Sequence, residues 1–242
     1  MIMRLITIPF SHYCEKARWA LQHARVPFRE EGHVPLLHWR ASFGAGGKRT
    51  VPVLVSDEGV LADSTDILAL ADRRAPADRK LYDGEAAALE DRFDVDFGPH
   101  TRRLGYWHAL PARARITELA TKDVPKWEAL VLRAAFPLAK AIMMRGMRID
   151  AEGARRSLEK VEQTFADVDA RLADGRRYLT GDRFTAADLT FAALAAPLLM
   201  PPEHPYAVSD GQAPGGLREL RDRFAASRAG KHALRMYREH RA

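Results

Sequence analysis

The sequence predicts a small α/β domain followed by an all-helical domain. Apolar, β-branched runs bounded by turn residues alternate with helical patterns as far as Ala75, and beyond Leu81 the strand signals stop. From there, apolar residues recur with helical spacing almost to the C-terminus. We therefore place an α/β domain at residues 1–76, a linker at residues 77–82 and a helical domain at residues 83–242.

The predicted α/β domain has the element order βαβαββα. Ser11 stands at the N-cap position of its first helix, and Asp63 caps its last helix. Asp57-Glu58-Gly59 supplies a hairpin turn between the last two strands. Strands are expected at residues 5–8, 27–31, 51–55 and 60–62, with a helical turn at residues 36–43.

The predicted helical domain contains five segments. The fourth segment is apolar on all sides, which predicts that it is the central buried helix. The fifth segment is expected to break near Ser227. The segments cover roughly residues 83–109, 114–144, 151–173, 186–198 and 217–241.

The composition is that of an ordinary globular protein: 47% of the 242 residues are hydrophobic and 29% are charged. The single cysteine excludes an intramolecular disulfide and fits a reducing, cytoplasmic location. The N-terminus lacks the features of a signal peptide. The longest apolar stretch, Leu189–Met200, is too short to span a bilayer, so we expect no membrane partner.

The net charge of +6 is a small difference between 38 basic and 32 acidic residues. The two kinds alternate along most predicted helices, and no run of like charge reaches five residues. This pattern does not favour a nucleic-acid partner. Nucleic-acid binding therefore stays a third class of function, behind the two discussed below.

The first informative stretch runs from Ser11 to Trp19. It joins a strand to an amphipathic helix, with Ser11 as N-cap and Glu15 in the first turn, where a carboxylate favours the helix dipole. Such a turn presents unpaired N–H groups next to Cys14 and suits a thiolate or another anion. The alternative interpretation is a capped helix that contains one buried cysteine.

Two further stretches point to ligand binding. Val51-Pro52 opens a strand, and a cis bond there would turn the backbone N–H and C=O of Val51 outward, toward an extended ligand. A simple edge-strand proline is the alternative. Asp63-Ser64 begins a helix, where a hydroxyl, backbone N–H groups and the helix dipole together suit a carboxylate. A helix cap alone would explain that pair equally well.

In their order and spacing, these stretches resemble the glutathione transferase superfamily. The likeness consists of an S-x-x-C turn after the first strand, V-P-V-L opening the third, and D-S-T capping the third helix. The segment Tyr178–Asp188 is similar to that family's capping motif, with Thr185 and Asp188 at capping-box spacing. The resemblance implies a thioredoxin-like N-terminal domain, an all-helical C-terminal domain and glutathione as co-substrate.

The resemblance also implies roles for particular residues. Val51, next to Pro52, would pair its backbone with the cysteinyl part of glutathione, and Asp63 and Ser64 would hold the γ-glutamyl end. Ser11 stands where the family places the residue that faces the glutathione sulfur. Cys14 stands where thioredoxin-like relatives have the second cysteine of C-x-x-C, whose first cysteine this chain lacks.

Other residues are weaker candidates for the site. Lys48 and Arg49 could reach the glycyl carboxylate, as could His38; solvated loop charges are the alternative. We expect the electrophile pocket at Tyr13, Tyr106 and Trp107, although aromatic residues there also suit a core. The nine histidines show no metal-ligand spacing, so no metal is expected.

The preferred function is a glutathione transferase that directs the glutathione thiolate at a small hydrophobic electrophile, as in detoxification. Ser11 is favoured over Cys14, because the first position of such a turn faces the ligand and a residue one turn later is more often buried. One alternative is a thiol transferase that acts through Cys14. The other is a non-catalytic binding or regulatory protein on the same fold. The family also implies a homodimer.

Overall fold

The computed structural model describes residues 2–207 and 215–241 and divides into two compact units. The first unit comprises Met1–Lys80 and Ala114–Ile142, and the second comprises Leu81–Arg113 and Met143–Ala242. Both the α/β part and the helical part are present, as predicted. The division also groups residues 114–142 with the α/β part, whereas the sequence prediction assigned them to the helical domain.

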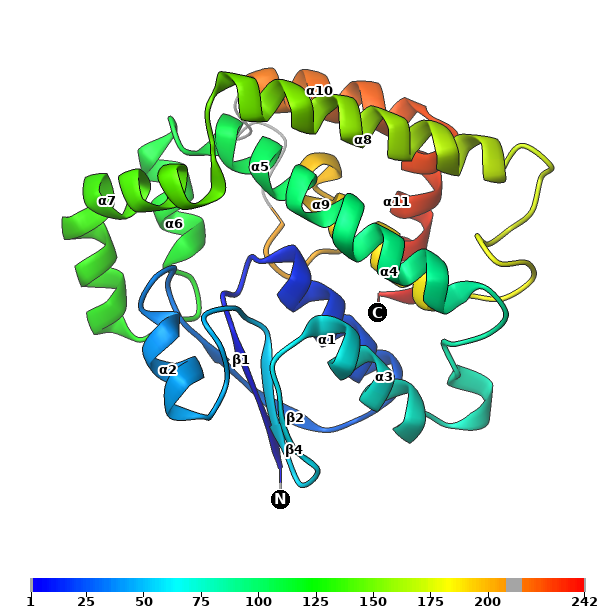
Figure 1. The fold of residues 1–242 in the computed structure, drawn as a ribbon, viewed down its shortest axis with the longest axis horizontal. Coiled ribbons are helices and arrows are strands. Elements are labelled where there is room, and N and C mark those ends of the chain that lie inside the picture. Colours follow the sequence, from blue (N-terminus) through cyan, green and yellow to red (C-terminus); the bar gives the residue numbers. More distant parts are fainter. Residues whose placement is uncertain (1, 208–214, 242) are drawn as a thin grey trace. The chain divides into compact units, whose positions relative to one another are not determined.

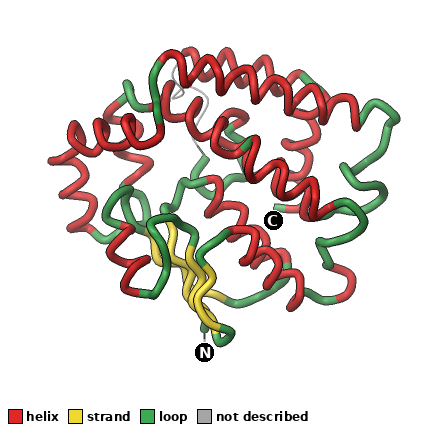
Figure 2. The backbone as a smooth tube through the Cα atoms, in the orientation of Figure 1, coloured by secondary structure: helices red, strands yellow, loops and turns green. Residues whose placement is uncertain are grey.

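The first unit is built on a four-stranded sheet of order β2-β1-β3-β4 (Figures 1 and 2). β1 pairs with β2 in parallel, and the other two pairings are antiparallel. A parallel pair needs a crossover connection, which α1 supplies. The elements are β1 (Met3–Thr7), α1 (His12–His23), β2 (Phe28–Gly32), α2 (His38–Gly44), β3 (Val53–Ser56), β4 (Gly59–Leu61) and α3 (Ser64–Arg74), followed by a single 3-10 turn, η1 (Ala77–Arg79).

Nearly all of α6 (Arg113–Ala120), and α7 (Lys126–Met147) as far as Ile142, extend this unit. Ala120, Leu132 and Ala139 form a cluster with Val34, which follows β2. Four partly buried residues pack against this cluster: Phe10, Leu36, Leu37 and Val124. The α6–α7 segment is therefore part of the core next to the turn that leads into α1.

A polar contact also ties α7 to the end of β2. The Glu128 carboxylate, which is buried, accepts the Val34 N–H at 3.0 Å and lies 2.7 Å from His33 Nδ1. The prediction of one helix over residues 114–144 is wrong, because the chain turns between α6 and α7. Asp123 has a positive φ of 56° there, and Pro125 has no N–H and disfavours a helical residue before it.

The second unit is all-helical, with the buried helix α9 at its centre. The ring of Phe191 on α9 lies 5.3 Å from those of Phe93 and Phe97 and 5.5 Å from that of Phe165. The prediction of a central apolar helix is therefore correct. The helices are α4 (Ala86–Asp96), α5 (Gly98–Ala109), α8 (Ala151–Arg171), α9 (Ala186–Leu199), α10 (Gly215–Ala226) and α11 (Arg228–His240).

One predicted helix is two helices in the structure, and one predicted helix break is confirmed. The segment expected at residues 83–109 is two helices, because Pro99 lies in the first turn of α5 and cannot donate a hydrogen bond to the preceding turn. The break near Ser227 is confirmed, and the Ser227 hydroxyl caps α11 by accepting the Gly230 N–H at 3.0 Å. In the described ranges no helix is long and apolar enough to cross a membrane.

The capping box before α9 is also confirmed. The buried Asp188 carboxylate accepts the backbone N–H groups of Leu179 at 2.8 Å and Thr185 at 3.0 Å. The same carboxylate lies 2.9 Å from Nε2 of the buried His232 on α11. Asp188 thus fixes the loop before α9 and joins α9 to α11, a structural role.

Candidate functional site

Strand register brings the three predicted stretches to one edge of the sheet. Ile6 on β1 lies opposite Val53 on β3, and Leu54 on β3 lies opposite Leu61 on β4. Ile8 directly follows β1, Val51 precedes β3 by two residues and Ser64 follows β4 by three; because β3 is antiparallel to both β1 and β4, all three residues leave the sheet at the same end. Ser11 belongs to the same edge, because its N–H donates to the Ile8 carbonyl at 2.9 Å.

The N-termini of two helices meet at this edge. α1 and α3 lie side by side (Figure 1), and Lys16 Nζ donates to Thr65 Oγ1 at 3.1 Å between their first turns. Each helix start carries the positive end of the helix dipole and N–H groups that the helix's own backbone hydrogen bonds do not use. The edge is therefore suited to anions, above all to a carboxylate and a thiolate.

Ser11 is the N-cap of α1, as predicted, and its backbone is extended at φ −72° and ψ 129°. Its hydroxyl makes no capping bond and its side chain is half-buried. The Asp63 carboxylate, by contrast, caps α3 by accepting the Thr65 N–H at 2.8 Å, next to the buried Ser64. The Ser11 hydroxyl and the Asp63 carboxylate thus lie at the starts of two different helices, α1 and α3, on this edge of the sheet.

The Val51–Pro52 peptide bond is cis, as predicted. The β3 ladder begins only at Val53, so Val51 lies just outside the strand pairing. In that respect Val51 meets the requirement for a residue that pairs its backbone with an extended ligand.

Cys14 lies one turn into α1 and is fully buried. Burial raises the pKa of the thiol to about 12, although the nearby Arg18 charge and hydrogen bonds to Ile8 and Ser11 act in the opposite direction. At neutral pH the thiol is therefore protonated and shielded from solvent. This environment is that of a structural cysteine rather than of a nucleophile.

Sequence reasoning missed a buried ion network beneath the Ser11 turn. The Arg18 guanidinium donates to Glu15 Oε2 at 2.5 Å and to both Glu30 oxygens, at 2.5 and 2.8 Å. It also donates to the Pro9 carbonyl at 3.0 Å, two residues before Ser11. Glu15 and Arg18, three residues apart on one helix face, were the available signal.

The loop from residue 45 to residue 50 is held by side chains of α2. The Ser42 hydroxyl binds the Lys48 carbonyl, and His38 Nε2 lies 3.0 Å from the Arg49 carbonyl. Burial lowers the pKa of His38, so the ring is neutral near pH 7 and serves to hold the loop. The side chains of Lys48 and Arg49 are exposed beside Val51, with the Arg49 guanidinium 4.3 Å above the Trp39 ring.

The residues predicted for the electrophile pocket belong to different units. Tyr13 lies on α1 in the first unit, whereas Tyr106 and Trp107 lie on α5 in the second. All three side chains are half-buried. Their assignment to one pocket stays a prediction.

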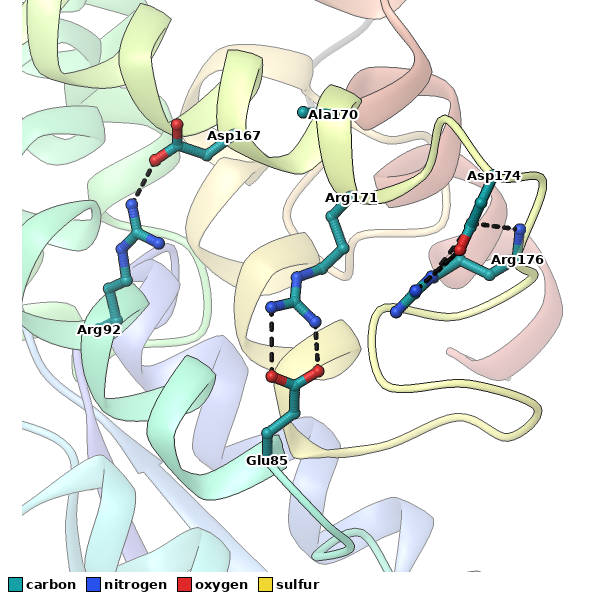
Figure 3. A pocket seen from close by; sticks show the side chains of 7 residues that line it. All are labelled: Glu85, Arg92, Asp167, Ala170, Arg171, Asp174 and Arg176. Carbon is teal, nitrogen blue, oxygen red and sulfur yellow. Dashed lines mark hydrogen bonds and ion pairs between the residues drawn. The ribbon is translucent and has the colours of Figure 1, made fainter.

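The second unit contains an open hollow of about 560 Å³ between α4, α8 and the loop after α8 (Figure 3). Its lining is charged and paired: Arg92 with Asp167, Arg171 with Glu85, and Arg176 with Asp174. Ala170 is its one apolar lining residue. Such a surface does not suit an apolar electrophile. Nor do the described residues contain a group of three His, Cys, Asp or Glu side chains able to hold a metal.

The chain is similar to solved structures of transferases over almost its whole length. Glutathione transferase F2 from Populus trichocarpa is 18% identical, with a TM-score of 0.58 and coverage of 98% of this chain and 99% of that one. A Methylobacterium radiotolerans glutathione S-transferase in complex with glutathione sulfonate is 20% identical, with a TM-score of 0.55 and coverage of 97% and 95%. The β-etherase LigF from Sphingobium is 18% identical, with a TM-score of 0.58 and coverage of 97% and 99%.

No curated protein matches the sequence significantly. Family models do match: residues 5–79 fit the glutathione S-transferase N-terminal domain, and residues 151–226 fit the glutathione S-transferase C-terminal domain. These two matches lie on either side of the α6–α7 segment and include the sheet edge and the capping box. The chain therefore belongs to the glutathione transferase superfamily, as its sequence motifs predicted.

Proposed function

We propose that the protein binds glutathione at the sheet edge formed by the Ser11 turn, Val51 and Ser64, and directs the glutathione thiolate at a small hydrophobic electrophile. The observation that carries this proposal is the convergence of these residues at one edge, together with two helix N-termini. Reduced glutathione and the single, unpaired cysteine both fit a cytoplasmic location.

Each part of glutathione has a chemically suited neighbour at this edge. The backbone of Val51 pairs with the cysteinyl residue, which lies extended beside the start of β3. The γ-glutamyl carboxylate takes the N-terminus of α3, and the γ-glutamyl amine takes the Asp63 carboxylate. Lys48 and Arg49, exposed next to Val51, attract the glycyl carboxylate.

Ser11 is the residue that faces the sulfur. A free thiol with a pKa of about 8.5 is only a few per cent ionised at neutral pH, so the site must stabilise the thiolate. The Ser11 hydroxyl donates to the sulfur, and the start of α1 adds its dipole. Lowering the thiol pKa by about 2 units corresponds to about 2.7 kcal/mol of thiolate stabilisation.

Cys14 takes no part in this chemistry. A thiol transferase needs an accessible thiolate of low pKa, whereas burial holds the pKa of Cys14 at about 12. The non-catalytic alternative needs no activation of the sulfur, so the effect of Ser11→Ala on the thiol pKa and on the rate distinguishes it from catalysis. A homodimer, the state that the family implies, is part of the proposal.

The test compares the wild-type protein with Ser11→Ala and Cys14→Ala. Calorimetry measures glutathione affinity, and the ultraviolet absorbance of the thiolate, followed over pH, gives the pKa of the bound thiol. A chloronitroaromatic compound and an aryl β-ether serve as electrophiles. Ser11→Ala should keep the affinity, raise the pKa of the bound thiol, and lower the rate by about 10- to 100-fold, the worth of a hydrogen bond to a charged group.

Cys14→Ala is the matched control and should change none of these quantities. No binding of millimolar glutathione by the wild type would refute the ligand assignment. An unchanged thiol pKa and rate in Ser11→Ala would refute the role of Ser11. Loss of activity in Cys14→Ala alone would instead favour the thiol transferase.

A further inference from the structure

Helix α7 exposes a row of large apolar side chains. Nine large apolar residues are exposed among the described residues, and five of them lie on this one helix. These five, called the α7 face here, are between 42% and 66% exposed: Trp127, Leu130, Val131, Leu138 and Ile142.

Their spacing places them on one side of the helix, with the exposed Ala134 and Ala141 between them. Leu132, Phe136 and Ala139 are buried on the opposite side. Pro137 lies inside the helix, and Figure 1 shows α7 bending along its length. The face continues through Leu138 beyond the proline, so it is present on both sides of the bend.

Basic residues accompany the apolar row. Lys126, Arg133 and Lys140 are spaced by seven residues, which sets them on one flank of the α7 face. Glu128 is the one acidic residue of α7, and it is buried against His33 and the Val34 N–H. The segment 113–148 contains eight basic and three acidic residues in a chain whose net charge is +6. Most of the excess positive charge is therefore concentrated around this helix.

We propose that the α7 face adsorbs reversibly to an anionic lipid bilayer. A helix that combines Trp and Leu on one side with Lys and Arg beside them has the composition of helices that lie in the membrane interface. Apolar side chains would enter the boundary between headgroups and acyl chains, while the basic flank would contact lipid phosphates. This mode is separate from the proposed catalysis and needs no membrane-spanning helix.

A second copy of the chain fits this face less well. The α7 face and its flank present no exposed carboxylate with which a second copy could pair its cations. In an antiparallel pairing across the apolar row, the two basic flanks would also lie on the same side and repel each other. Charge complementarity therefore favours an anionic surface.

The experiment uses the full-length protein and sedimentation with lipid vesicles. Vesicles of phosphatidylcholine alone are compared with vesicles of equal parts phosphatidylglycerol and phosphatidylcholine, at low and high salt. We expect binding to the anionic vesicles only, weakened by salt, with a blue shift of tryptophan fluorescence that Trp127→Phe abolishes. The double variant Arg133→Gln/Lys140→Gln should bind about 30-fold more weakly, and Leu130→Ser/Leu138→Ser at least about tenfold more weakly.

Two control variants carry changes of the same kind elsewhere in the protein. Lys231→Gln/Arg238→Gln removes two exposed charges from α11, and Val95→Ser removes an exposed apolar residue from α4; both should bind as the wild type does. Circular dichroism establishes that each variant is folded. The proposal is overturned if the wild-type protein does not bind anionic vesicles, or if the control variants lose as much binding as the α7 variants do. A change of oligomeric state in Leu130→Ser/Leu138→Ser without vesicle binding would also overturn it, in favour of a second copy.

Discussion

Replacing Arg18 by methionine should destabilise the first unit strongly, because methionine fills a similar volume but removes the cation that pairs with the buried Glu15 carboxylate. Arg18 is only 3% exposed, and its guanidinium binds two carboxylates and the Pro9 carbonyl. Glu15 is fully buried. Removing one partner of such a pair typically costs about 3–5 kcal/mol, well above the cost of losing an exposed ion pair.

The assay is equilibrium unfolding in urea, followed by the fluorescence of Trp19, which is buried on the same helix. Two companion variants separate charge from geometry. Arg18→Lys keeps the charge but loses the planar fork and should fall between the wild type and Arg18→Met. Arg18→Met/Glu15→Gln also removes the Glu15 charge and should recover part of the loss. A cost below about 1 kcal/mol for Arg18→Met, or no recovery in the double variant, would refute the assignment of an energetically coupled network.

Two other predictions concern buried groups. The native pKa of Cys14 is about 12, whereas that of an unfolded thiol is about 8.5. The native state therefore retains the proton to higher pH than the unfolded state does. The stability contributed by Cys14 should decline as the pH rises from about 8.5 toward 12. The wild type should lose about 2 kcal/mol more than Cys14→Ala between pH 8.5 and about 10.5 in urea titrations, and parallel curves would contradict the burial of the thiol. Asp188→Ala should destabilise the second unit by about 3 kcal/mol or more, since two backbone N–H groups and His232 lose their buried partner. A cost like that of an exposed helix cap, about 1 kcal/mol, would show that the capping box before α9 contributes little to stability.

Local signals predicted the α/β part and several structural features at the sheet edge well. The N-caps Ser11 and Asp63, the Val51-Pro52 step and the capping box at Asp188 each depend on a few neighbouring residues, so they were visible in the sequence. The prolines at 99 and 125 were visible too, yet helical periodicity continued across both and hid the breaks.

Long-range partners could not be predicted in the same way. Arg18 on α1 meets Glu30 on β2, the strand that follows this helix, and Glu128 meets His33 across 95 positions of the chain. Nothing in local spacing indicates either contact. The contact of His38 with the Arg49 carbonyl, and the burial that lowers the pKa of its ring, likewise follow from the tertiary fold.

The division of the chain has a consequence for how it folds during synthesis. The polypeptide passes from the first unit to the second after Lys80, returns at Ala114 and leaves again after Ile142. The residues that cover Val34 and accept its N–H, on α6 and α7, are thus made well after the sheet. At ribosomal rates of 5–20 residues per second, residues 81–142 take roughly 3–12 s, during which the nascent sheet lacks part of its own core. A fragment that ends at the linker would remain in that incomplete state permanently, so neither unit can be excised by a single cut.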